Sequence, residues 1–419
     1  MERIALYSQD THGLGRLRRN IAIARALAGG EPRAILLISG AGEAAVLKLP
    51  AGTDTLTLPR VGGGEDGGRG LGIGAEALLR VRAEALRSAL VAFEPDALIV
   101  DRLPSGVGGE LAASFDVLHE IGARLVLGLP EVLGDAARVR ADWRASDAYD
   151  VVRRHYDAVW VYGDPNVFDP VEDCGMPRDV ARMVRYSGYL DGYGPGPAAA
   201  ERERTLRDEH RLGDGPVCVC LAGGNDEGVR LAETFARTPL PAGTTGVLLT
   251  GPFLDAGDRA GLEALAAGRD DLRIIELLPD ADTLIWMADQ VIAMGGYHTT
   301  CEALAAGKRA LIVPSAERRP DQLIRAERLA DLGAVDLMLH AHLTPVALGA
   351  WLAGGPRPPE ALSGAIDTDG LHRLPVLLDE LAAPAEVLAP RRRLALRWSS
   401  RRRQAAALAP VASAGAAAG

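Results

Sequence analysis

The sequence has no run of about 18 apolar residues, the length that a membrane-spanning helix needs. It begins with Met1, Glu2 and Arg3 and passes at once into an apolar segment, so we expect no secretion signal. Lysine is nearly absent, since Lys48 and Lys308 are the only two and arginine supplies the remaining positive charge. We interpret this bias as compositional rather than chemical. Together these features predict a cytoplasmic protein.

Cysteine is also scarce. Cys174, Cys218, Cys220 and Cys301 lack the paired spacing of zinc ligands, and no feature of secretion favours disulfides. Cys218 and Cys220 lie two residues apart in a predicted strand and therefore share one face of it. We expect all four side chains to fill the hydrophobic core.

The chain also lacks a strong excess of one charge. Charged residues make up 24% of it and the formal net charge is -10, and neither figure indicates disorder or nucleic-acid binding over the chain as a whole. With 419 residues, 48% of them hydrophobic, the chain is long enough to build two cores.

Short apolar segments alternate with amphipathic helical patterns and glycine turns through most of the sequence. The predicted strands are 4–7, 34–38, 97–100, 124–127, 158–162, 217–221, 246–249, 272–275, 290–293 and 310–313. This alternation predicts an α/β fold with mostly parallel sheets. Residues 188–215 are rich in glycine and proline and then charged, which is typical of a hinge between domains.

The strongest functional pattern begins at the predicted strand 290–293. The double glycine Gly295-Gly296 follows it, and a helix is predicted over 299–306, ending at Gly307. Free backbone N–H groups and the positive end of the helix dipole would then face the turn. This arrangement predicts an anion site.

A second junction of the same kind follows directly. Pro314 closes the strand 310–313, and Asp321 and Gln322 open a helix predicted over 323–332. Ligands bind at this end of the strands in parallel α/β sheets, so both junctions are expected to face one site.

The first glycine turn is less informative. Gly13 and Gly15 match half of a dinucleotide-binding fingerprint, but Arg18 stands where the third glycine belongs. The next strand ends in Ser39 and Gly40, with no acidic residue to hold a ribose. A nicotinamide-type site is therefore disfavoured.

Several of these residues also have structural interpretations. Thr299 and Glu302 fit a capping box, with Thr299 as the N-cap. Asp280-Ala-Asp282 matches a metal-binding pattern, but we favour Asp282 as the N-cap of a helix over 283–288. His340 and His342 would share a strand face without an evident third metal ligand. Thr344 is predicted to cap a helix that starts at Pro345.

At this point the motifs resemble a known family. The segment 295–333 resembles the donor-binding half of GT-B glycosyltransferases, in particular the MurG-like group, through Gly295, Gly296, Thr300, Glu302, Gly307, Pro314, Asp321, Gln322 and Gly333. The N-terminal half resembles a bacterial subgroup of predicted glycosyltransferases over residues 7–19, 101–110, 127–133 and 161–170. The resemblance covers about residues 1–385.

The resemblance implies two Rossmann-like, doubly wound domains that face a cleft. The N-terminal domain, 1–190, would bind the acceptor, and residues 191–214 would form the hinge. The C-terminal domain, 215–385, would bind a nucleotide-diphosphate sugar. Residues 386–419 hold a basic run and an alanine-rich stretch, and we expect a partly disordered tail there.

The resemblance also assigns roles to residues. Backbone N–H groups over 295–300 would stabilise the pyrophosphate leaving group. Glu302 would accept hydrogen bonds from ribose hydroxyls, while Asp321 and Gln322 would bind sugar hydroxyls. His298 would donate to phosphate or face solvent. The expected donor site comprises Gly223, Gly224, Asn225, Gly295, Gly296, His298, Thr299, Thr300, Glu302, Asp321 and Gln322.

The acceptor side departs from the relatives. Its expected residues are Gly13, Gly15, Arg16 and Asp101. Relatives place a histidine where this chain has Arg16, and Pro130 stands where an arginine is expected. His12 or Asp10 would then be the catalytic base. Otherwise the acceptor needs no strong base, or activity is reduced.

The sequence thus predicts an inverting, metal-independent glycosyltransferase that uses a nucleotide-diphosphate sugar, with uridine as the favoured base and no cofactor. The alternatives are hydrolysis or epimerisation of a nucleotide sugar, and non-catalytic binding of a sugar nucleotide or a partner. The expected partners are a small-molecule donor and an acceptor that offers a hydroxyl or other nucleophile, without nucleic acid. A peripheral membrane contact and the oligomeric state stay open.

Overall fold

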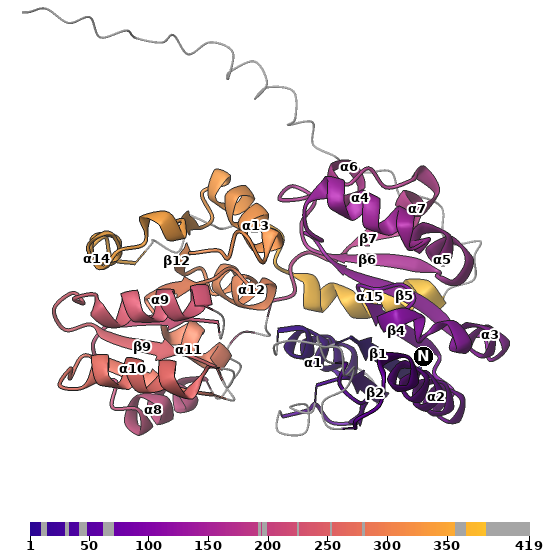
Figure 1. The fold of residues 1–419 in the computed structure, drawn as a ribbon, viewed down its shortest axis with the longest axis horizontal. Coiled ribbons are helices and arrows are strands. Elements are labelled where there is room, and N and C mark those ends of the chain that lie inside the picture. Colours follow the sequence, from indigo (N-terminus) through magenta and orange to yellow (C-terminus); the bar gives the residue numbers. More distant parts are fainter. Residues whose placement is uncertain are drawn as a thin grey trace, which may run out of the picture. The chain divides into compact units, whose positions relative to one another are not determined.

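The computed structural model describes residues 1–9, 15–29, 33–41, 48–61, 71–191, 194, 199–223, 226–251, 254–278, 281–356 and 366–382. Within them, two parallel β-sheets follow one another along the chain, each flanked by helices (Figure 1). The α/β fold with parallel sheets that the alternating pattern predicts is confirmed, and so are the two Rossmann-like sheets that the resemblance implies.

The first sheet has seven strands in the order β3-β2-β1-β4-β5-β6-β7. They are β1 (Arg3–Ser8), β2 (Ala34–Ser39), β3 (Thr53–Thr57), β4 (Ala97–Asp101), β5 (Arg124–Pro130), β6 (Ala158–Tyr162) and β7 (Val184–Tyr186). The connecting helices are α1 (Gly15–Ala28), α2 (Ala75–Phe93), α3 (Ala112–Glu120), α4 (Ala136–Ala145), α5 (Ala148–His155), α6 (Pro170–Asp173) and α7 (Arg178–Met183), with the 3-10 turn η2 (Val107–Gly109). Strand order reverses between β1 and β4, which makes this sheet doubly wound.

The second sheet has six strands in the order β10-β9-β8-β11-β12-β13. They are β8 (Val217–Leu221), β9 (Thr245–Leu249), β10 (Leu272–Ile275), β11 (Gln290–Ala293), β12 (Arg309–Ile312) and β13 (Asp336–Leu337). The helices are α8 (Ala199–Glu209), α9 (Asp226–Arg237), α10 (Ala256–Ala266), α11 (Ala281–Met287), α12 (Tyr297–Ala305), α13 (Pro320–Asp331), α14 (Pro345–Leu352) and α15 (Gly370–Ala382), with the 3-10 turn η3 (His340–His342). Here the order reverses between β8 and β11.

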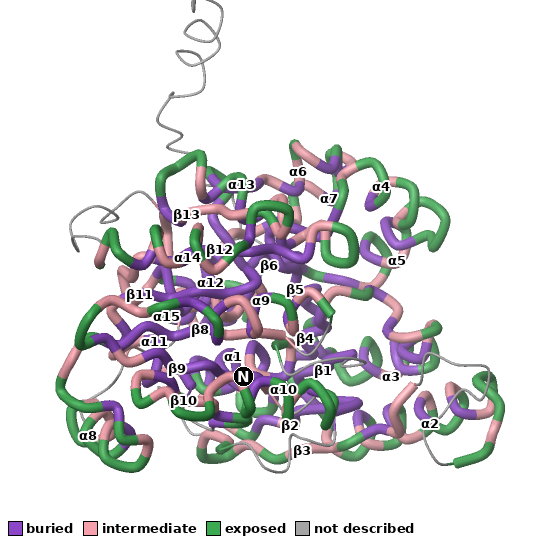
Figure 2. Tube along the Cα trace, turned by 60° about the vertical axis from the view of Figure 1, so that its left-hand side comes forward, coloured by how far each residue is buried: buried purple, intermediate pink, exposed green. Residues whose placement is uncertain are grey.

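Both faces of the sheets are covered, so the inner strands are buried along their length (Figure 2). In β8, Val217 and Val219 join one apolar cluster while Cys218 and Cys220 join another on the opposite face. The four cysteines are free and buried, as expected for core residues.

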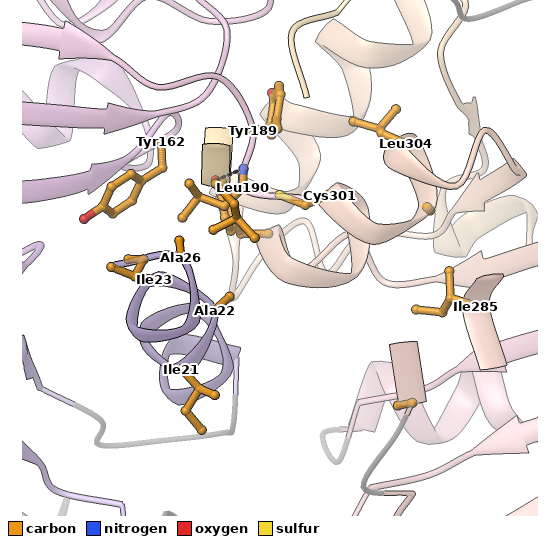
Figure 3. Packing of buried hydrophobic residues seen from close by; sticks show 14 of the residues in the cluster. Ile21, Ala22, Ile23, Ala26, Tyr162, Tyr189, Leu190, Ile285, Cys301 and Leu304 are labelled. Carbon is orange, nitrogen blue, oxygen red and sulfur yellow. Dashed lines mark hydrogen bonds between the residues drawn. The ribbon is translucent and has the colours of Figure 1, made fainter. Parts of the chain in front are cut away.

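One apolar cluster connects helices from distant parts of the chain. α1 contacts both α12 and α15. Figure 3 shows Ile23 and Ala26 of α1 close to Leu190, with Cys301 of α12 on its other side. The segment after residue 366 thus returns to the helices of the first sheet.

The predicted strand 290–293 is confirmed, and so is the end of the helix after it. Gly307 has φ +62°, and its N–H and that of Lys308 donate to the carbonyls of Leu304 and Ala303 at 3.0 and 3.1 Å. This is a Schellman motif, which needs a residue with positive φ.

Several helix starts were predicted too late. α12 begins at Tyr297 with Gly296 as its N-cap, so a capping box with Thr299 as N-cap is wrong. α13 begins at Pro320 rather than at Leu323.

Other local predictions had mixed outcomes. Asp282 lies inside the first turn of α11 and does not cap it. His340 and His342 belong to a 3-10 turn and not to a strand. The Thr344 cap is confirmed, since its hydroxyl accepts from the Ala347 N–H at 3.1 Å.

Candidate functional site

The candidate site lies where the strand order of the second sheet reverses. β8 and β11 are neighbours there. The strands that follow β8 in the chain lie on one side of this pair, and those that follow β11 lie on the other side. Gly223 follows β8 and the pair Gly295-Gly296 follows β11. Ligands of doubly wound sheets bind in the crevice that such a reversal opens beyond the carboxyl ends of the strands.

Gly295 can be replaced by no other residue without strain. Its φ is +78°, and a Cβ atom built there would lie 2.6 Å from Cγ2 of Ile312. Gly296 is the N-cap of α12, and no side chain caps the helix. Among the described residues, no N-cap side chain occupies the N–H groups of the first turn, and the helix dipole favours an anion beside them.

Glu302 and His298 lie one turn apart on α12. The Nε2 atom of His298 is 3.1 Å from Oε1 of Glu302. Within the described part of the chain, Oε2 of Glu302 and Nδ1 of His298 are buried and have no hydrogen-bond partner. Such atoms are costly unless something binds them, so the pair offers one acceptor and one ring nitrogen to a ligand.

The charge of Glu302 is maintained despite its burial. Burial acts to raise the pKa of this carboxyl, but His298 and, more weakly, Arg18 outweigh it, and the pKa lies below its ordinary value. Glu302 is therefore a carboxylate that can only accept hydrogen bonds, which suits hydroxyl donors.

The two threonines of this turn have different surroundings. The Thr300 hydroxyl donates to the Gly296 carbonyl at 2.9 Å, and its backbone N–H donates to the same oxygen at 3.0 Å. Thr300 thus holds the turn through its side chain. Thr299 is half-buried in the first turn of the helix, and its ligand role stays a prediction.

Asp321 and Gln322 open α13 at the next strand end. Asp321 accepts from Nε and Nη2 of Arg319 at 3.0 and 3.1 Å. Burial acts to raise the pKa of the Asp321 carboxyl, but Arg319 and Arg325 lower it below its ordinary value. The side-chain oxygen of Gln322 accepts from the Ser315 N–H at 3.0 Å and fixes the turn after β12.

The loop after β8 comes close to α9. The Gly223 N–H donates to the sulfur of Met294 at 3.3 Å, which links the two strand ends. A Cβ atom on Gly228 would lie 2.0 Å from the Gly223 carbonyl oxygen, so Gly228 permits this close approach. Gly224 and Asn225, also predicted for the donor site, lie outside the described residues.

Gly15, Arg16 and Asp101, three of the four predicted acceptor residues, lie on α1 and β4, which belong to the reversal of the first sheet. Asp101 is the last residue of β4, and the Arg19 Nη2 donates to its two oxygens at 2.5 and 2.7 Å. Gly15 starts α1, and the Arg16 carbonyl accepts from the Asn20 side chain at 3.0 Å.

The candidate bases and one glycine are not placed. Asp10, His12 and Gly13 lie outside the described residues, as do Asp280 and the tail 386–419. Their roles stay predictions.

Sequence reasoning missed a buried group that links the two sheets. Arg325 of α13 pairs with Glu131, which directly follows β5, and Nη1 of Arg325 donates to the Gly295 carbonyl at 3.1 Å. The available signal was local: Asp321 and Arg325 are an acid–base pair one helical turn apart, 3.8 Å between charged atoms.

Tyr297 completes this group. The guanidinium carbons of Arg19 and Arg325 lie 5.4 and 5.6 Å from its ring centroid, within reach of a cation–π interaction. Its hydroxyl accepts from the Leu190 N–H at 3.2 Å.

The described residues hold neither a metal-binding cluster nor a helix that could span a membrane. No group of three or more His, Cys, Asp or Glu side chains there could hold a metal ion. Among the same residues, no helix has both the length and the apolar composition to cross a membrane.

The sequence is similar to curated transferases. It is 32% identical over 175 residues to the UDP-N-acetylglucosamine–N-acetylmuramyl-(pentapeptide) pyrophosphoryl-undecaprenol N-acetylglucosamine transferase of Burkholderia vietnamiensis, covering 38% of this chain and 46% of the relative. With the enzyme of the same name from Klebsiella pneumoniae it shares 26% identity over 300 residues, 69% of this chain and 72% of the relative. No family model matches the chain.

Solved structures share the fold over most of the chain. Acinetobacter baumannii MurG gives a TM-score of 0.53 at 16% identity, covering 91% of this chain and 100% of that structure. The UDP-GlcNAc 2-epimerase of Neisseria meningitidis, bound to UDP-GlcNAc, gives 0.56 at 13% identity, covering 91% and 99%. The calicheamicin glycosyltransferase CalG4 gives 0.55 at 15% identity, covering 92% and 100%.

The structure has two doubly wound sheets, and its last described helix returns to the first of them. The structural neighbours indicate the same architecture. The chain has the GT-B fold of nucleotide-sugar glycosyltransferases and is a distant homologue of the MurG transferases.

Proposed function

We propose that this protein is an inverting, metal-independent glycosyltransferase whose donor is a nucleotide-diphosphate sugar, with uridine as the base. The observation that carries the proposal is the open hydrogen-bonding capacity beside an uncapped helix: Oε2 of Glu302 and the first-turn N–H groups of α12. A ribose hydroxyl would donate to Glu302, and the diphosphate would accept from the turn after Gly295.

The chemistry is a single displacement. The acceptor hydroxyl would attack the anomeric carbon of the sugar as the bond from that carbon to the diphosphate oxygen breaks. The nucleoside diphosphate leaves with the bonding electron pair, and a base takes the hydroxyl proton. N–H groups aimed at the diphosphate lower the barrier because negative charge develops there in the transition state. His12 and Asp10 are the proposed bases.

The base preference rests on relatives. The curated homologues are transferases of UDP-N-acetylglucosamine by name, and one structural neighbour holds UDP-GlcNAc. These names describe those proteins, and they make UDP the first nucleotide to test here.

A thermal-shift panel of UDP, ADP, GDP, CDP and TDP tests the donor class. A ligand that binds only the folded protein stabilises it by about 2.7 kcal/mol at a hundredfold excess over its dissociation constant. We expect a selective shift with UDP. Glu302→Ala should weaken UDP binding by about 1–3 kcal/mol, the scale of a lost hydrogen bond to a charged group.

The outcomes separate the possibilities. Unchanged affinity in Glu302→Ala would remove Glu302 from the site, and no shift with any nucleotide would refute the donor assignment. A chelator should leave transfer intact, and loss of transfer on chelation would refute metal independence.

Epimerisation or hydrolysis of the donor is the second candidate. Structural neighbours named as UDP-GlcNAc 2-epimerases match with TM-scores of 0.56 and 0.57, as high as those of the transferases. Consumption of a UDP-sugar by the purified protein without an added acceptor would favour this candidate. Consumption that depends on an acceptor would favour transfer.

A further inference from the structure

Arg325 touches both predicted donor-binding features at once. Its Nη1 donates to the carbonyl of Gly295 at 3.1 Å and lies 3.8 Å from Oδ2 of Asp321. The side chain is 1% exposed, so these contacts form away from water. Its third partner, Glu131, comes from the other sheet.

Glu131 is held from several sides. Its Oε1 accepts from Nε of Arg325 and from the Tyr189 hydroxyl, the latter at 3.2 Å, and its Oε2 lies 3.3 Å from Nη2 of Arg325. The backbone of Gly163 packs closely against Glu131, because a Cβ atom built on Gly163 would lie 2.5 Å from Cβ of Glu131. The Glu131 carboxylate is thus held by Arg325 and Tyr189, and its Cβ packs closely against Gly163, which directly follows β6.

The ion pair keeps Arg325 charged. Burial acts to lower the pKa of the guanidinium, but the Glu131 carboxylate outweighs it, and the pKa of Arg325 lies above its ordinary value. A buried ion pair is weak evidence for stability, because desolvation of the two charges offsets their attraction. What this pair does provide is a fixed direction for the guanidinium fork.

That direction orients the turn after β11. The peptide unit between Gly295 and Gly296 is planar, and its C=O and N–H point to opposite sides. When Arg325 fixes the Gly295 carbonyl on its own side, the Gly296 N–H must face away from Arg325. The guanidinium of Arg325 also lies beside Asp321. Arg325 therefore orients both the Gly295 turn and the Asp321 carboxylate.

We propose that Arg325 and Glu131 are positioning residues of the nucleotide-sugar site, through which the end of β5 in the first sheet fixes the Gly295 turn and Asp321 in the second. This inference rests on the proposed function. Neither residue is a catalytic residue, since each acts through Gly295 or Asp321. Without the Glu131 charge, Arg325 would turn toward Asp321 and release the Gly295 carbonyl.

The chain offers a closely matched control. Glu110 is also buried, accepts from Nε and Nη2 of Arg82 at 2.6 and 2.7 Å, and receives the hydroxyl of Tyr7. Arg82 lies in α2 and Glu110 directly follows the turn η2, so both belong to the part of the chain that forms the first sheet. Glu131→Gln and Glu110→Gln therefore remove equivalent charges from equivalent Arg–Glu–Tyr groups, and only the first group touches the donor turn.

The experiment measures UDP binding by titration calorimetry on the full chain, with the melting temperature of each variant. We expect both glutamine variants to melt earlier than the wild type. Glu131→Gln should weaken UDP binding at least tenfold, while Glu110→Gln should stay within twofold. Amide hydrogen exchange should rise over residues 294–300 in Glu131→Gln and stay unchanged there in Glu110→Gln, a local effect that general destabilisation does not produce.

Each contrary result has one meaning. If the wild type binds UDP and both variants retain that binding, or both lose it equally, this inference is overturned and the proposed function stands. No binding of any nucleotide by the wild type would overturn both. If Glu131→Gln does not fold, Tyr189→Phe and its control Tyr7→Phe apply the same comparison by removing one hydroxyl each.

Discussion

Gly295→Ala is the sharpest test of the turn after β11. The new methyl group meets two penalties. A left-handed backbone with φ +78° costs an alanine about 1–2 kcal/mol. A Cβ atom 2.6 Å from Cγ2 of Ile312 must push that side chain aside, and such overpacking costs about 1–3 kcal/mol more. We expect a total destabilisation of about 2–5 kcal/mol.

Gly307→Ala is the matched control at the other end of α12. Its φ is +62°, but a Cβ atom there would meet nothing within 4 Å. Only the backbone penalty of about 1–2 kcal/mol applies. Urea denaturation of the two variants beside the wild type measures the difference directly.

Ile312→Ala in the Gly295→Ala background separates the two penalties. It removes the Cγ2 atom, so the double variant should be more stable than the sum of the single changes predicts, by about the overpacking penalty. Additive effects, or equal losses in Gly295→Ala and Gly307→Ala, would refute the claim that this turn is closed against any side chain.

Three further predictions concern other parts of the chain. Burial raises the pKa of the half-buried Asp191 to about 6, so the folded protein retains a proton that the unfolded chain releases near its ordinary pKa of 3.8. This contribution to stability is lost as the pH rises through about 6. Asp191→Asn should therefore stabilise the protein at about pH 8 but not at about pH 4, and thermal melts at the two pH values can show this. We expect a gain of about 1 kcal/mol at about pH 8, after allowance for solvent screening. Asp101→Asn should destabilise by about 3–5 kcal/mol in urea, because it leaves the buried Arg19 without its charge partner; a loss below about 1 kcal/mol would contradict this. Thr344→Ala should cost about 1 kcal/mol through the lost cap of α14, and Thr344→Ser should restore it.

Local features of the fold could be predicted from the sequence. The strand 290–293 and the helix end at Gly307 follow from apolar runs and from residues that tolerate positive φ. The start of α12 could not be located in this way. Thr299 and Glu302 match a capping box, yet the helix continues back to Tyr297, whose ring lies within cation–π reach of Arg19 and Arg325. Tertiary contacts decided where the helix begins.

Some residues of the candidate site could be predicted from the sequence, and others could not. Glu302 and Asp321 could be named because they stand beside glycine turns at strand ends. Glu131 and Arg325 could not, since 194 positions separate them and no spacing rule connects residues in different sheets. The pairing depends on how the two halves of residues 1–382 fold together as one compact unit.

The return of α15 to α1 makes the N-terminal folding module discontinuous. Leu371, Leu374 and Leu378 are buried in the cluster that also holds the apolar side of α1, and the Gly370 N–H donates to the Tyr189 carbonyl at 3.0 Å. A recombinant N-terminal fragment that stops near residue 190 would expose this apolar surface. A chimera in which the donor-binding half is exchanged for that of a relative would therefore fold only if residues 366–382 are kept together with the N-terminal half. The exchanged part would then be an internal segment rather than the whole C-terminal portion.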